Sequence, residues 1–240
     1  MKTLAIEGSE TDAGVYADKL VPGNAVIVDG NGVEVTANYD ITYVPGALTI
    51  TRRGAGDMKV ELTAANNTVV YDGQPHGAKL NAAGQIEVGT SYTTEYLAPG
   101  HKVQTVAIDG SETMVGVYEN KLVPNAAIIV DKNDNDVTRN YVITYVPGTL
   151  EIRKNETEIK VTANSHTWEY DGQPHSDGGY TVEYDGQTYK VEAGKTATLP
   201  TGDVVKAKIT KTVTNVSDSA ANNNQIDELT IVNAAGEDTK

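Results

Sequence analysis

One acidic run in the sequence comes close to the ligand spacing of a calcium-binding loop. Asp131–Asp136 carries side-chain oxygens at its first, third and fifth positions, as an EF-hand loop does. The sixth position of such a loop is Gly and the twelfth is Glu, but here they are Asp136 and Val142. The related run Asp29–Glu34 has far fewer ligands. We therefore predict a solvated hairpin turn and no metal site, with a weak cation site as the alternative.

The histidines do not form a metal-binding set by their spacing. There are four of them: His76, His101, His166 and His175. His76 and His175 each end a copy of the motif Y-D-G-Q-P-H, so they hold equivalent positions in two separate repeats. Two positions that lie one module apart do not converge on a single metal ion. We expect these histidines at turns or strand edges.

Catalytic motifs are missing from the sequence. The chain has no Cys, which excludes thiolate zinc sites, disulfides and thiol catalysis. It contains neither the G-x-S-x-G motif of serine hydrolases nor a glycine-rich phosphate loop before a helix. Carboxylates are so numerous that no pair stands out as a general acid and base. The sequence predicts no catalytic residues, no cofactor and no enzymatic activity.

Tyrosine supplies nearly all of the aromatic surface, with 13 Tyr, one Trp and no Phe. A tyrosine ring packs in a core while its hydroxyl contacts water, and exposed rings bind sugars and peptides. Three pairs recur at equivalent positions and are expected in the core: Tyr39 and Tyr141, Tyr43 and Tyr145, and Tyr71 and Tyr170. The aromatic residues without a repeated partner are the candidate ligand contacts: Tyr92, Tyr96, Tyr180, Tyr184, Tyr189 and Trp168.

The charge balance argues against two classes of partner. Acidic residues number 33 and basic residues 19, which gives the 240-residue chain a net charge of −14. Phosphate contacts require clustered Lys and Arg, so we expect neither nucleic acid nor an anionic membrane surface as a partner. No apolar run reaches the length of a signal peptide or a membrane span. We expect no membrane insertion by this segment, and any export signal or anchor to lie outside it.

The elements that must position these residues are arranged in repeats. Residues 7–52 match residues 109–154 without a gap, and 28 of the 46 pairs are identical. Both segments close on the sequence N-Y-x-I-T-Y-V-P-G-x-L-x-I, at Asn38–Ile50 and Asn140–Ile152. We call this sequence the closing motif. A second match aligns Val60–His76 with Ile159–His175.

The two matches predict three consecutive copies. Residues 1–55 are the second half of a copy, residues 56–154 are a complete copy, and residues 155–240 are a partial, divergent copy without the closing motif. We call them the N-terminal, middle and third copies. In the third copy, Thr230–Asn233 falls at the position of Ile128–Asp131. The joins are short and polar, which favours modules that follow one another in an extended line.

Alternation of apolar and polar side chains predicts strands in all three copies. It runs through Tyr39–Tyr43 and its counterpart Tyr141–Tyr145, and through Val205–Val213, where one face is expected to be solvated. Three shorter runs follow the same pattern: Leu48–Ile50, Val60–Leu62 and Ile159–Val161. Continuous apolar runs at Val26–Val28 and Ile128–Val130 predict central strands that are buried on both faces.

Turn residues separate these runs. Asp72-Gly73 and Asp171-Gly172 open the Y-D-G-Q-P-H motifs, and Pro45-Gly46 and Pro147-Gly148 lie between alternating runs. Gly allows the positive φ of a tight turn and Pro presets the negative one, so we predict turns at all four places. The motif Y-D-G-Q-P-H is interpreted as a tight turn with a packed Tyr. A helical signal is confined to residues 9–12, before Val15 and Leu20, and predicts one short helix at most.

Three motifs together resemble those of a known family. They are Y-D-G-x-P, G-S-x-T-x-x-G-x-Y and the closing motif, and they are similar to the MBG-type repeats of large bacterial cell-surface proteins, which are related to mucin-binding β-grasp modules. The resemblance covers nearly the whole chain, but Thr214–Ser217 of the third copy departs from it. It implies mainly β, tandem β-grasp-like modules with at most short helices in an elongated arrangement. Short alternating strands equally fit immunoglobulin-like β-sandwiches.

The resemblance also implies a function. It indicates a non-catalytic repeat region of a bacterial cell-surface protein, extracellular or attached to the cell wall, that acts as a stalk or spacer in adhesion. The alternative is an adhesin module that binds host glycan, mucin or a surface protein, with neighbouring repeats as further partners.

A covalent Lys–Asn crosslink would require a buried Lys near a carboxylate. Because a half copy leaves a strand edge unpaired, we expect residues 1–55 or the region before Lys240 to pair with another molecule, unless the module boundary is shifted.

Overall fold

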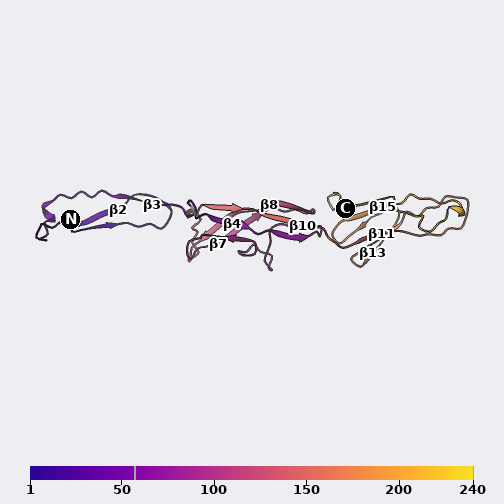
Figure 1. Cartoon of the computed structure of the whole chain (residues 1–240), viewed down its shortest axis with the longest axis horizontal. Coiled ribbons are helices and arrows are strands. Elements are labelled where there is room, and N and C mark those ends of the chain that lie inside the picture. Colours follow the sequence, from indigo (N-terminus) through magenta and orange to yellow (C-terminus); the bar gives the residue numbers. More distant parts are fainter. Residues whose placement is uncertain (57, 240) are drawn as a thin grey trace. The chain divides into compact units, whose positions relative to one another are not determined.

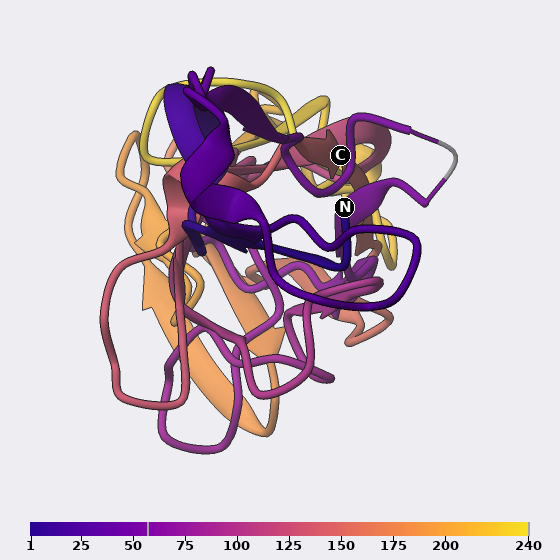
Figure 2. The same cartoon turned by 90° about the vertical axis from the view of Figure 1, so that its left-hand side faces the viewer.

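The computed structural model of the chain describes residues 1–56 and 58–239. These residues form sixteen β-strands and three 3-10 helices, and no α-helix occurs among them (Figures 1 and 2). The prediction of a mainly β chain is confirmed. The helix expected at residues 9–12 is wrong, because this stretch is an irregular loop between two strands. None of the helical segments in the described residues has the length and apolarity needed to cross a membrane.

The chain divides into two compact units, and each combines segments that are distant in sequence. Unit 1 consists of Met1–Asn67, Ala78–Gly110 and Glu119–Thr149. Unit 2 consists of Thr68–Gly77, Ser111–Tyr118 and Leu150–Lys240. The units are defined by contacts and the copies by sequence similarity, so the copy boundaries at residues 55 and 154 stay predictions.

The N-terminal copy forms one antiparallel sheet of three strands. Its strand order is β1 (Thr3–Glu7), β2 (Gly14–Val26), β3 (Gly46–Ile50). The start of β2 pairs with β3, from Gly14 opposite Ile50 to Leu20 opposite Gly46. Residues 40–45, between the 3-10 helix η1 (Thr36–Asn38) and β3, belong to no strand. The strand predicted over Tyr39–Tyr43 is therefore wrong, because strand geometry is stabilised by a pairing partner, and this copy provides none.

The middle copy contributes to two sheets. One has the order β6 (Tyr92–Thr94), β4 (Val60–Ala64), β9 (Ile143–Val146). The other has the order β5 (Asn67–Val70), β10 (Gly148–Arg153), β8 (Gly116–Val130), β7 (Lys102–Asp109). The central strand β4 pairs antiparallel with β6 and parallel with β9, with Val60 opposite Ile143 and Leu62 opposite Tyr145. The strand predicted at Val60–Leu62 is confirmed, and that predicted over Tyr141–Tyr145 is confirmed from Ile143 onward.

The core of the middle copy is formed by side chains from both sheets. One cluster joins Leu62 and Tyr92 of the first sheet to Ala127 of β8. The other joins Val60 to Ile129 of β8 and to Tyr141, which follows the 3-10 helix η2 (Thr138–Asn140). Burial of such aliphatic side chains contributes about 1.5–3 kcal/mol each, so this core is the main source of stability for the copy.

The two continuous apolar runs are less buried than predicted. Ile128 is 38% exposed between the buried residues Ala127 and Ile129, so β8 alternates between an inner and an outer face. Val26 is half-buried at the end of β2, and Val28 forms only a single bridge to Glu34. The prediction of strands buried on both faces is confirmed at Ile129 and Val130, which are 0% and 1% exposed. It is wrong at Ile128 and in Val26–Val28, whose residues are only half-buried.

The Pro-Gly pair of the closing motif is not a positive-φ turn. Gly46 and Gly148 are absent from the glycines with positive φ, whereas Gly73 and Gly172 adopt φ of 80° and 76°. At Pro147 the chain leaves β9 in one sheet and enters β10 in the other. The turns predicted at Asp72-Gly73 and Asp171-Gly172 are confirmed. The prediction at Pro147-Gly148 is corrected to a crossing between sheets, and that at Pro45-Gly46 to an irregular segment that leads into β3.

The third copy has two antiparallel sheets of three strands. The first sheet has the order β11 (Ile159–Ala163), β12 (Tyr180–Tyr184), β13 (Gln187–Val191). The second has the order β14 (Ala197–Thr198), β15 (Val204–Lys208), β16 (Glu228–Val232). Tyr180, Val182 and Val205 are fully buried in their common core. The strand predicted over Val205–Val213 stops at Lys208, because Asp227 Oδ2 accepts hydrogen bonds from the backbone N–H and the hydroxyl of Thr210 at 2.7 Å each.

Candidate functional site

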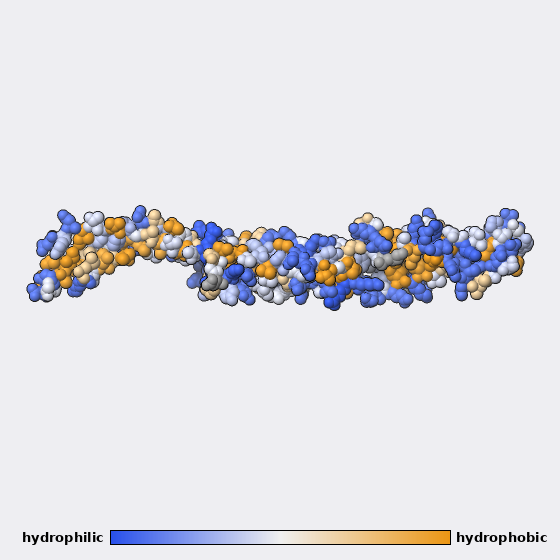
Figure 3. Space-filling view, turned by 45° about the horizontal axis from the view of Figure 1, so that its top comes forward, coloured by the Kyte–Doolittle hydropathy of each residue, from blue (hydrophilic) through white to orange (hydrophobic). Residues whose placement is uncertain are grey.

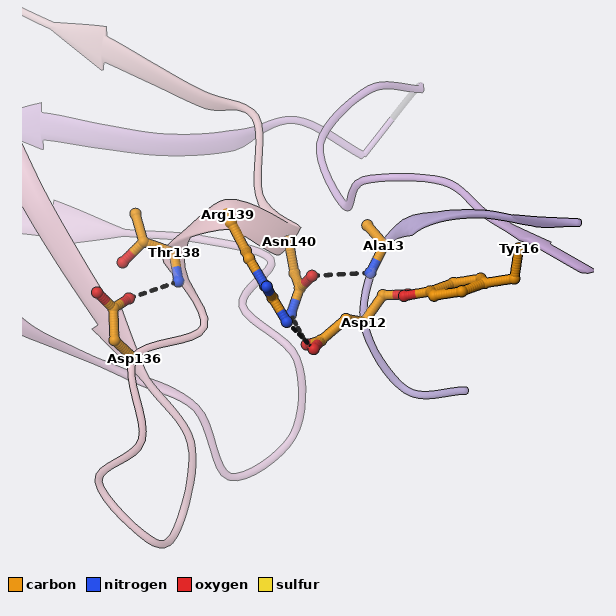
Figure 4. A network of polar contacts seen from close by, with 7 residues as sticks. All are labelled: Asp12, Ala13, Tyr16, Asp136, Thr138, Arg139 and Asn140. Carbon is orange, nitrogen blue, oxygen red and sulfur yellow. Dashed lines mark hydrogen bonds and ion pairs between the residues drawn. The ribbon is translucent and has the colours of Figure 1, made fainter. Parts of the chain in front are cut away.

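The best-defined polar cluster of unit 1 joins the N-terminal copy to the middle copy (Figure 4). The side-chain amide of Asn140 donates to Asp12 Oδ1 at 2.7 Å and accepts from the backbone N–H of Ala13 at 2.7 Å. Arg139 forms an ion pair with the other oxygen of Asp12. We call these four residues junction 1. The two amide contacts fix the orientation of the Asn140 side chain as well as its distance from Asp12 and Ala13.

Local structure on each side holds junction 1 in place. Asn140 ends η2, whose first residue Thr138 donates its N–H to Asp136 Oδ1 at 2.9 Å and accepts from the N–H of Ile129 at 2.8 Å. On the other side, the hydroxyl of Tyr16 donates to the backbone oxygen of Asp12 at 2.9 Å. Each partner is therefore also held by hydrogen bonds within its own copy.

Charge favours the ionised form of Asp12 in this arrangement. The hydrogen bond from Asn140, and then that from Arg139, lowers the pKa of the Asp12 carboxyl below its usual range. Hydrogen bonds to a carboxylate stabilise the charged form, so junction 1 is strongest where Asp12 is deprotonated.

The segment that connects the N-terminal and middle copies is hydrogen-bonded along its backbone. Arg53 donates its N–H to the oxygen of Asn140 at 2.9 Å, and its own oxygen accepts from Val142 at 2.8 Å. Arg53 and Tyr141 thus form a parallel bridge. Gly54 follows at φ 91°, and a Cβ there would lie 2.3 Å from the oxygen of Val142. The close approach explains why Gly follows Arg53.

Unit 2 contains a corresponding contact between the middle and third copies. The hydroxyl of Tyr71 donates to Asp203 Oδ1 at 2.7 Å, and the hydroxyl of Thr201 donates to Asp203 Oδ2 at 2.8 Å. Tyr71 and Asp203 are 7% and 5% exposed, so the carboxylate is buried and satisfied by these donors. We call Tyr71, Thr201 and Asp203 junction 2. Burial, followed by the hydrogen bond to Asp203, raises the pKa of Tyr71 well above its usual range.

The connection between the middle and third copies is also tied down. The side-chain amide of Asn155 donates to the backbone oxygen of Tyr71 at 3.2 Å and to the hydroxyl of Tyr184 at 3.3 Å. Gly73 of the Y-D-G-Q-P-H motif lies so close to Thr201 that a Cβ would meet its oxygen at 1.8 Å. The motif is therefore packed against the following copy and is more than a free turn.

The position of Asp12 contacts the next copy a second time, with different chemistry. Asp12 corresponds to Met114, 102 residues later, and the sulfur of Met114 accepts a hydrogen bond from the amide of Asn233 at 3.3 Å. In both cases the loop contacts the next copy: the loop between β1 and β2 contains Asp12, and the loop between β7 and β8 contains Met114. The sequence alone did not reveal these residues, because Asp12 and Met114 differ and no motif contains Asp203.

A cleft of about 620 Å³ lies wholly within the third copy and carries the aromatic and histidine side chains of that region. The ring of Trp168 stacks with His166 at 4.3 Å between centroids and with His175 at 5.2 Å. Tyr170 lines the same cleft and is 67% exposed. Asn222, Asn223 and Asn224 add amide groups to the lining. The arrangement offers an exposed aromatic ring beside hydrogen-bonding groups.

The predicted turn or edge position of the motif histidines is confirmed. The ring Nε2 of His76 lies 2.8 Å from Asp72 Oδ1, and that of His175 lies 2.8 Å from Asp171 Oδ1. Each histidine also forms an isolated backbone bridge, His76 with Glu112 and His175 with Val213. The Asp and His side chains thus close the turn within each motif.

The tyrosine predictions are only partly correct. Tyr71 and Tyr141 are buried as expected and Tyr145 is half-buried, but their counterparts Tyr170, Tyr39 and Tyr43 are 67%, 57% and 38% exposed. Among the candidate ligand contacts, three are buried and offer no binding face: Tyr92, Tyr180 and Tyr184. Tyr189 and Trp168 are half-buried, and Tyr96 is 51% exposed. Similarity between copies does not fix burial, since each copy has different neighbours.

The acidic run is a turn closed by its own side chains. Asp131 Oδ1 accepts from the N–H groups of Asn133 at 2.8 Å and Asn135 at 2.9 Å. Asp29 makes the same two contacts in the N-terminal copy. Among residues 1–56 and 58–239, no group of three or more potential metal ligands lies close enough to hold an ion. In the same residues no lysine is buried, so the group that a Lys–Asn crosslink requires is not found there.

His101 lies elsewhere in the fold. Its ring Nδ1 is 2.7 Å from the hydroxyl of Tyr141, which also accepts from the N–H of Ala98 at 3.2 Å. It therefore supports a core tyrosine of the middle copy.

Neither a family model, a curated protein nor a solved structure matches the chain. The resemblance to MBG-type repeats therefore remains an expectation.

Proposed function

We propose that the chain is a non-catalytic spacer, a repeat region of a bacterial cell-surface protein that acts as a stalk in adhesion. The observation that carries the proposal is the way consecutive copies are joined. In unit 1 the connecting residue Arg53 is bridged to Tyr141, and in unit 2 Asn155 is bonded to Tyr71 and Tyr184. A linker whose backbone and side chains are bonded on both sides transmits orientation from one copy to the next, as a spacer requires.

The location follows from the resemblance in sequence. Tandem copies of this kind are expected outside the cell, attached to its surface or wall, with the neighbouring repeats as the first partners. The module type belongs to the proposal as well. In the middle copy, side chains of two sheets pack in common clusters. This packing supports an immunoglobulin-like sandwich as the alternative to a β-grasp-like module.

Small-angle X-ray scattering tests the spacer function. A compact domain of 240 residues has a radius of gyration of about 18 Å, and a stiff spacer gives a much larger value. The variant Asn140→Ala removes both amide contacts of junction 1, so its scattering is expected to show a broader distribution of shapes. Asn38→Ala is the matched control, since Asn38 holds the same motif position. A wild-type radius near that of a compact domain would overturn the proposal.

A second candidate function is the binding of a glycan by the third-copy cleft. It is favoured by the exposed ring of Tyr170 beside the amide side chains of the cleft, because sugars stack on aromatic faces and bond to amides. Fluorescence of Trp168, the only Trp of the chain, reports on the cleft directly. Titration with mucin-type oligosaccharides is expected to change this signal in the wild type and not in Tyr170→Ala. An unchanged signal at millimolar sugar would exclude this function.

A further inference from the structure

Unit 2 contains a cavity of about 660 Å³ that is lined by third-copy residues and by Tyr71, Met114 and Val115 of the middle copy. Its third-copy walls correspond to those around a buried tyrosine of the middle copy. Its apolar lining includes Ile159, Leu199 and Ile231, with Tyr184 and Thr239 beside them. All of these residues belong to unit 2. The cavity is distinct from the histidine-lined cleft described above.

The middle copy shows what such a cavity holds. There the ring of Tyr141, 6% exposed, packs with Val60, Ile129 and Leu97. Ile159 is the counterpart of Val60, and Ile231 and Leu199 follow Ile129 and Leu97 by 102 residues. Strand pairing gives the same match, since Val103 lies opposite Ile129 and Val205 lies opposite Ile231. The walls of the cavity thus correspond to the tyrosine socket of the middle copy.

The strand beside the cavity has one unpaired edge in the described part of the chain. β4 of the middle copy lies between β6 and β9, whereas its counterpart β11 pairs only with β12 at the edge of its sheet. The consequence is visible in burial. Val60 and Leu62 of β4 are 0% exposed, whereas the equivalent Ile159 and Val161 of β11 are only half-buried. Both are positions that β9 and Tyr141 cover in the middle copy.

A matching strand is exposed in the N-terminal copy. The closing motif at Asn38–Ile50 has a sequence close to the one that forms Tyr141 and β9 in the middle copy, but residues 40–45 form no strand in the described chain. The Tyr43 hydroxyl accepts the N–H of Ala25 at 3.0 Å, as that of Tyr145 accepts the N–H of Ala127 beside β9. Tyr39 is 57% and Val44 76% exposed, and apolar residues lie on the surface of this copy, at the left of Figure 3. An extended segment with exposed apolar residues is suited to adding to a sheet edge.

We propose that Tyr39–Val44 of one molecule adds as a parallel strand to β11 of a second molecule, with the ring of Tyr39 in the cavity of unit 2. The register of β4 and β9 places Ile41 opposite Ile159 and Tyr43 opposite Val161. Asp203, the counterpart of His101, lies in the wall of the cavity, where it already accepts a hydrogen bond from the hydroxyl of Tyr71. The ring of Tyr39 therefore supplies apolar contact with Ile159, Leu199 and Ile231.

The association is heterologous, because donor and acceptor are different surfaces of the chain. Residues 1–56 and 58–239 present one donor segment and one acceptor edge of this kind, so chains of this sequence are expected to form a head-to-tail series rather than a closed dimer. The proposal does not rest on the spacer function. A chain that fails as a spacer still presents the same edge and the same segment.

Sedimentation velocity from micromolar to submillimolar protein tests the proposal. The wild type is expected to gain mass with concentration, and Tyr39→Ala is expected to need at least about tenfold more protein for the same degree of association, since a buried aromatic anchor dominates such an interface. Tyr170→Ala, which removes an equally exposed ring outside the proposed contact, is the control and should associate as the wild type does. Circular dichroism checks that each variant retains its strands.

A peptide with the sequence of Asn38–Ile50 provides the second test. Added in excess, it is expected to dissociate the series and to slow hydrogen exchange at Ile159–Ala163, whereas a peptide with Ala in place of Tyr39 and Ile41 should do neither. A wild type that stays monomeric throughout, or a Tyr39→Ala variant that associates as strongly as the wild type, would overturn the proposal. Peptide protection of β11 in a monomeric wild type would equally exclude a second molecule as the occupant.

Discussion

The closing motif occurs twice in the chain and folds in two different ways. In the middle copy, Tyr141 is 6% exposed and β9 pairs along β4. In the N-terminal copy, the equivalent Tyr39 is 57% exposed and residues 40–45 form no strand. The two sequences are nearly identical, so the difference lies in the partner. The alternation of side chains makes a segment able to form a strand, and an open edge beside it decides whether it does.

The largest expected effect concerns the tyrosine at the start of the motif. Tyr141→Ala removes a buried ring and should lower the free energy of unfolding of the middle copy by about 3–5 kcal/mol. Tyr39→Ala removes an exposed ring and should change stability by less than about 0.5 kcal/mol. Urea denaturation of dilute protein measures both changes. Equal losses would show that the two copies bury this position alike.

A smaller effect is expected at the tyrosine of the Y-D-G-Q-P-H motif. Tyr71→Phe deletes the hydroxyl that donates to the buried Asp203, which should cost about 1.5–3 kcal/mol in unit 2 because a hydrogen bond to a charged group is lost. Tyr170→Phe changes the exposed counterpart and should have no measurable effect. Thermal and urea unfolding of the two variants compare them directly. A neutral Tyr71→Phe would argue against junction 2 as a stabilising contact.

The glycine of the closing motif gives a third matched pair. A Cβ at Gly148 would lie 2.8 Å from the oxygen of Ala64 and 2.9 Å from that of Ala65, whereas at Gly46 its nearest neighbour would be a Leu20 carbon at 3.7 Å. Gly148→Ala should therefore destabilise the middle copy by about 1–3 kcal/mol through overpacking. Gly46→Ala should be neutral within about 0.5 kcal/mol. Similar costs at both sites would contradict the different packing of the two motifs.

The smallest effect is the pH dependence of junction 1. The folded pKa of Asp12 lies below its ordinary value, so its contribution is complete above that value and is lost as the pH falls through the lowered pKa. Met114, at the equivalent position, does not titrate, so its contact with Asn233 has no such pH dependence. Carboxyl NMR titration is expected to show the low pKa of Asp12 in the wild type and a return toward the ordinary value in Asn140→Ala. An identical pKa in both proteins would disprove the contact.

The sequence was sufficient to predict the local structure of the middle copy. Alternation located the strands at Val60–Leu62 and at Tyr141–Tyr145, and the Asp-Gly pairs located two turns with positive φ. These features depend on residues that are close in sequence. The same rules were wrong for Tyr39–Tyr43, where no neighbouring strand is present. They were right for Val205–Lys208 but wrong for the rest of the run to Val213, where Asp227 binds the backbone of Thr210.

The contacts between copies could not be predicted in the same way. Asn140 meets Asp12, and Tyr71 meets Asp203, across 128 and 132 residues of sequence. One partner in each pair belongs to a recurring motif, but the other does not recur, so the repeat pattern gave no sign of the pairing. Burial was equally unpredictable at Tyr170, since its counterpart Tyr71 is 7% exposed and bonded to Asp203 of the following copy.

Hydrogen exchange of the backbone amides in dilute protein tests the dependence of strand formation on a partner most directly. The account predicts slow exchange within Ile143–Val146, which is bonded to β4, and fast exchange within the equivalent residues 41–44. Similar protection of the two segments in monomeric protein would contradict it, because the same sequence would then form a strand without a neighbouring edge.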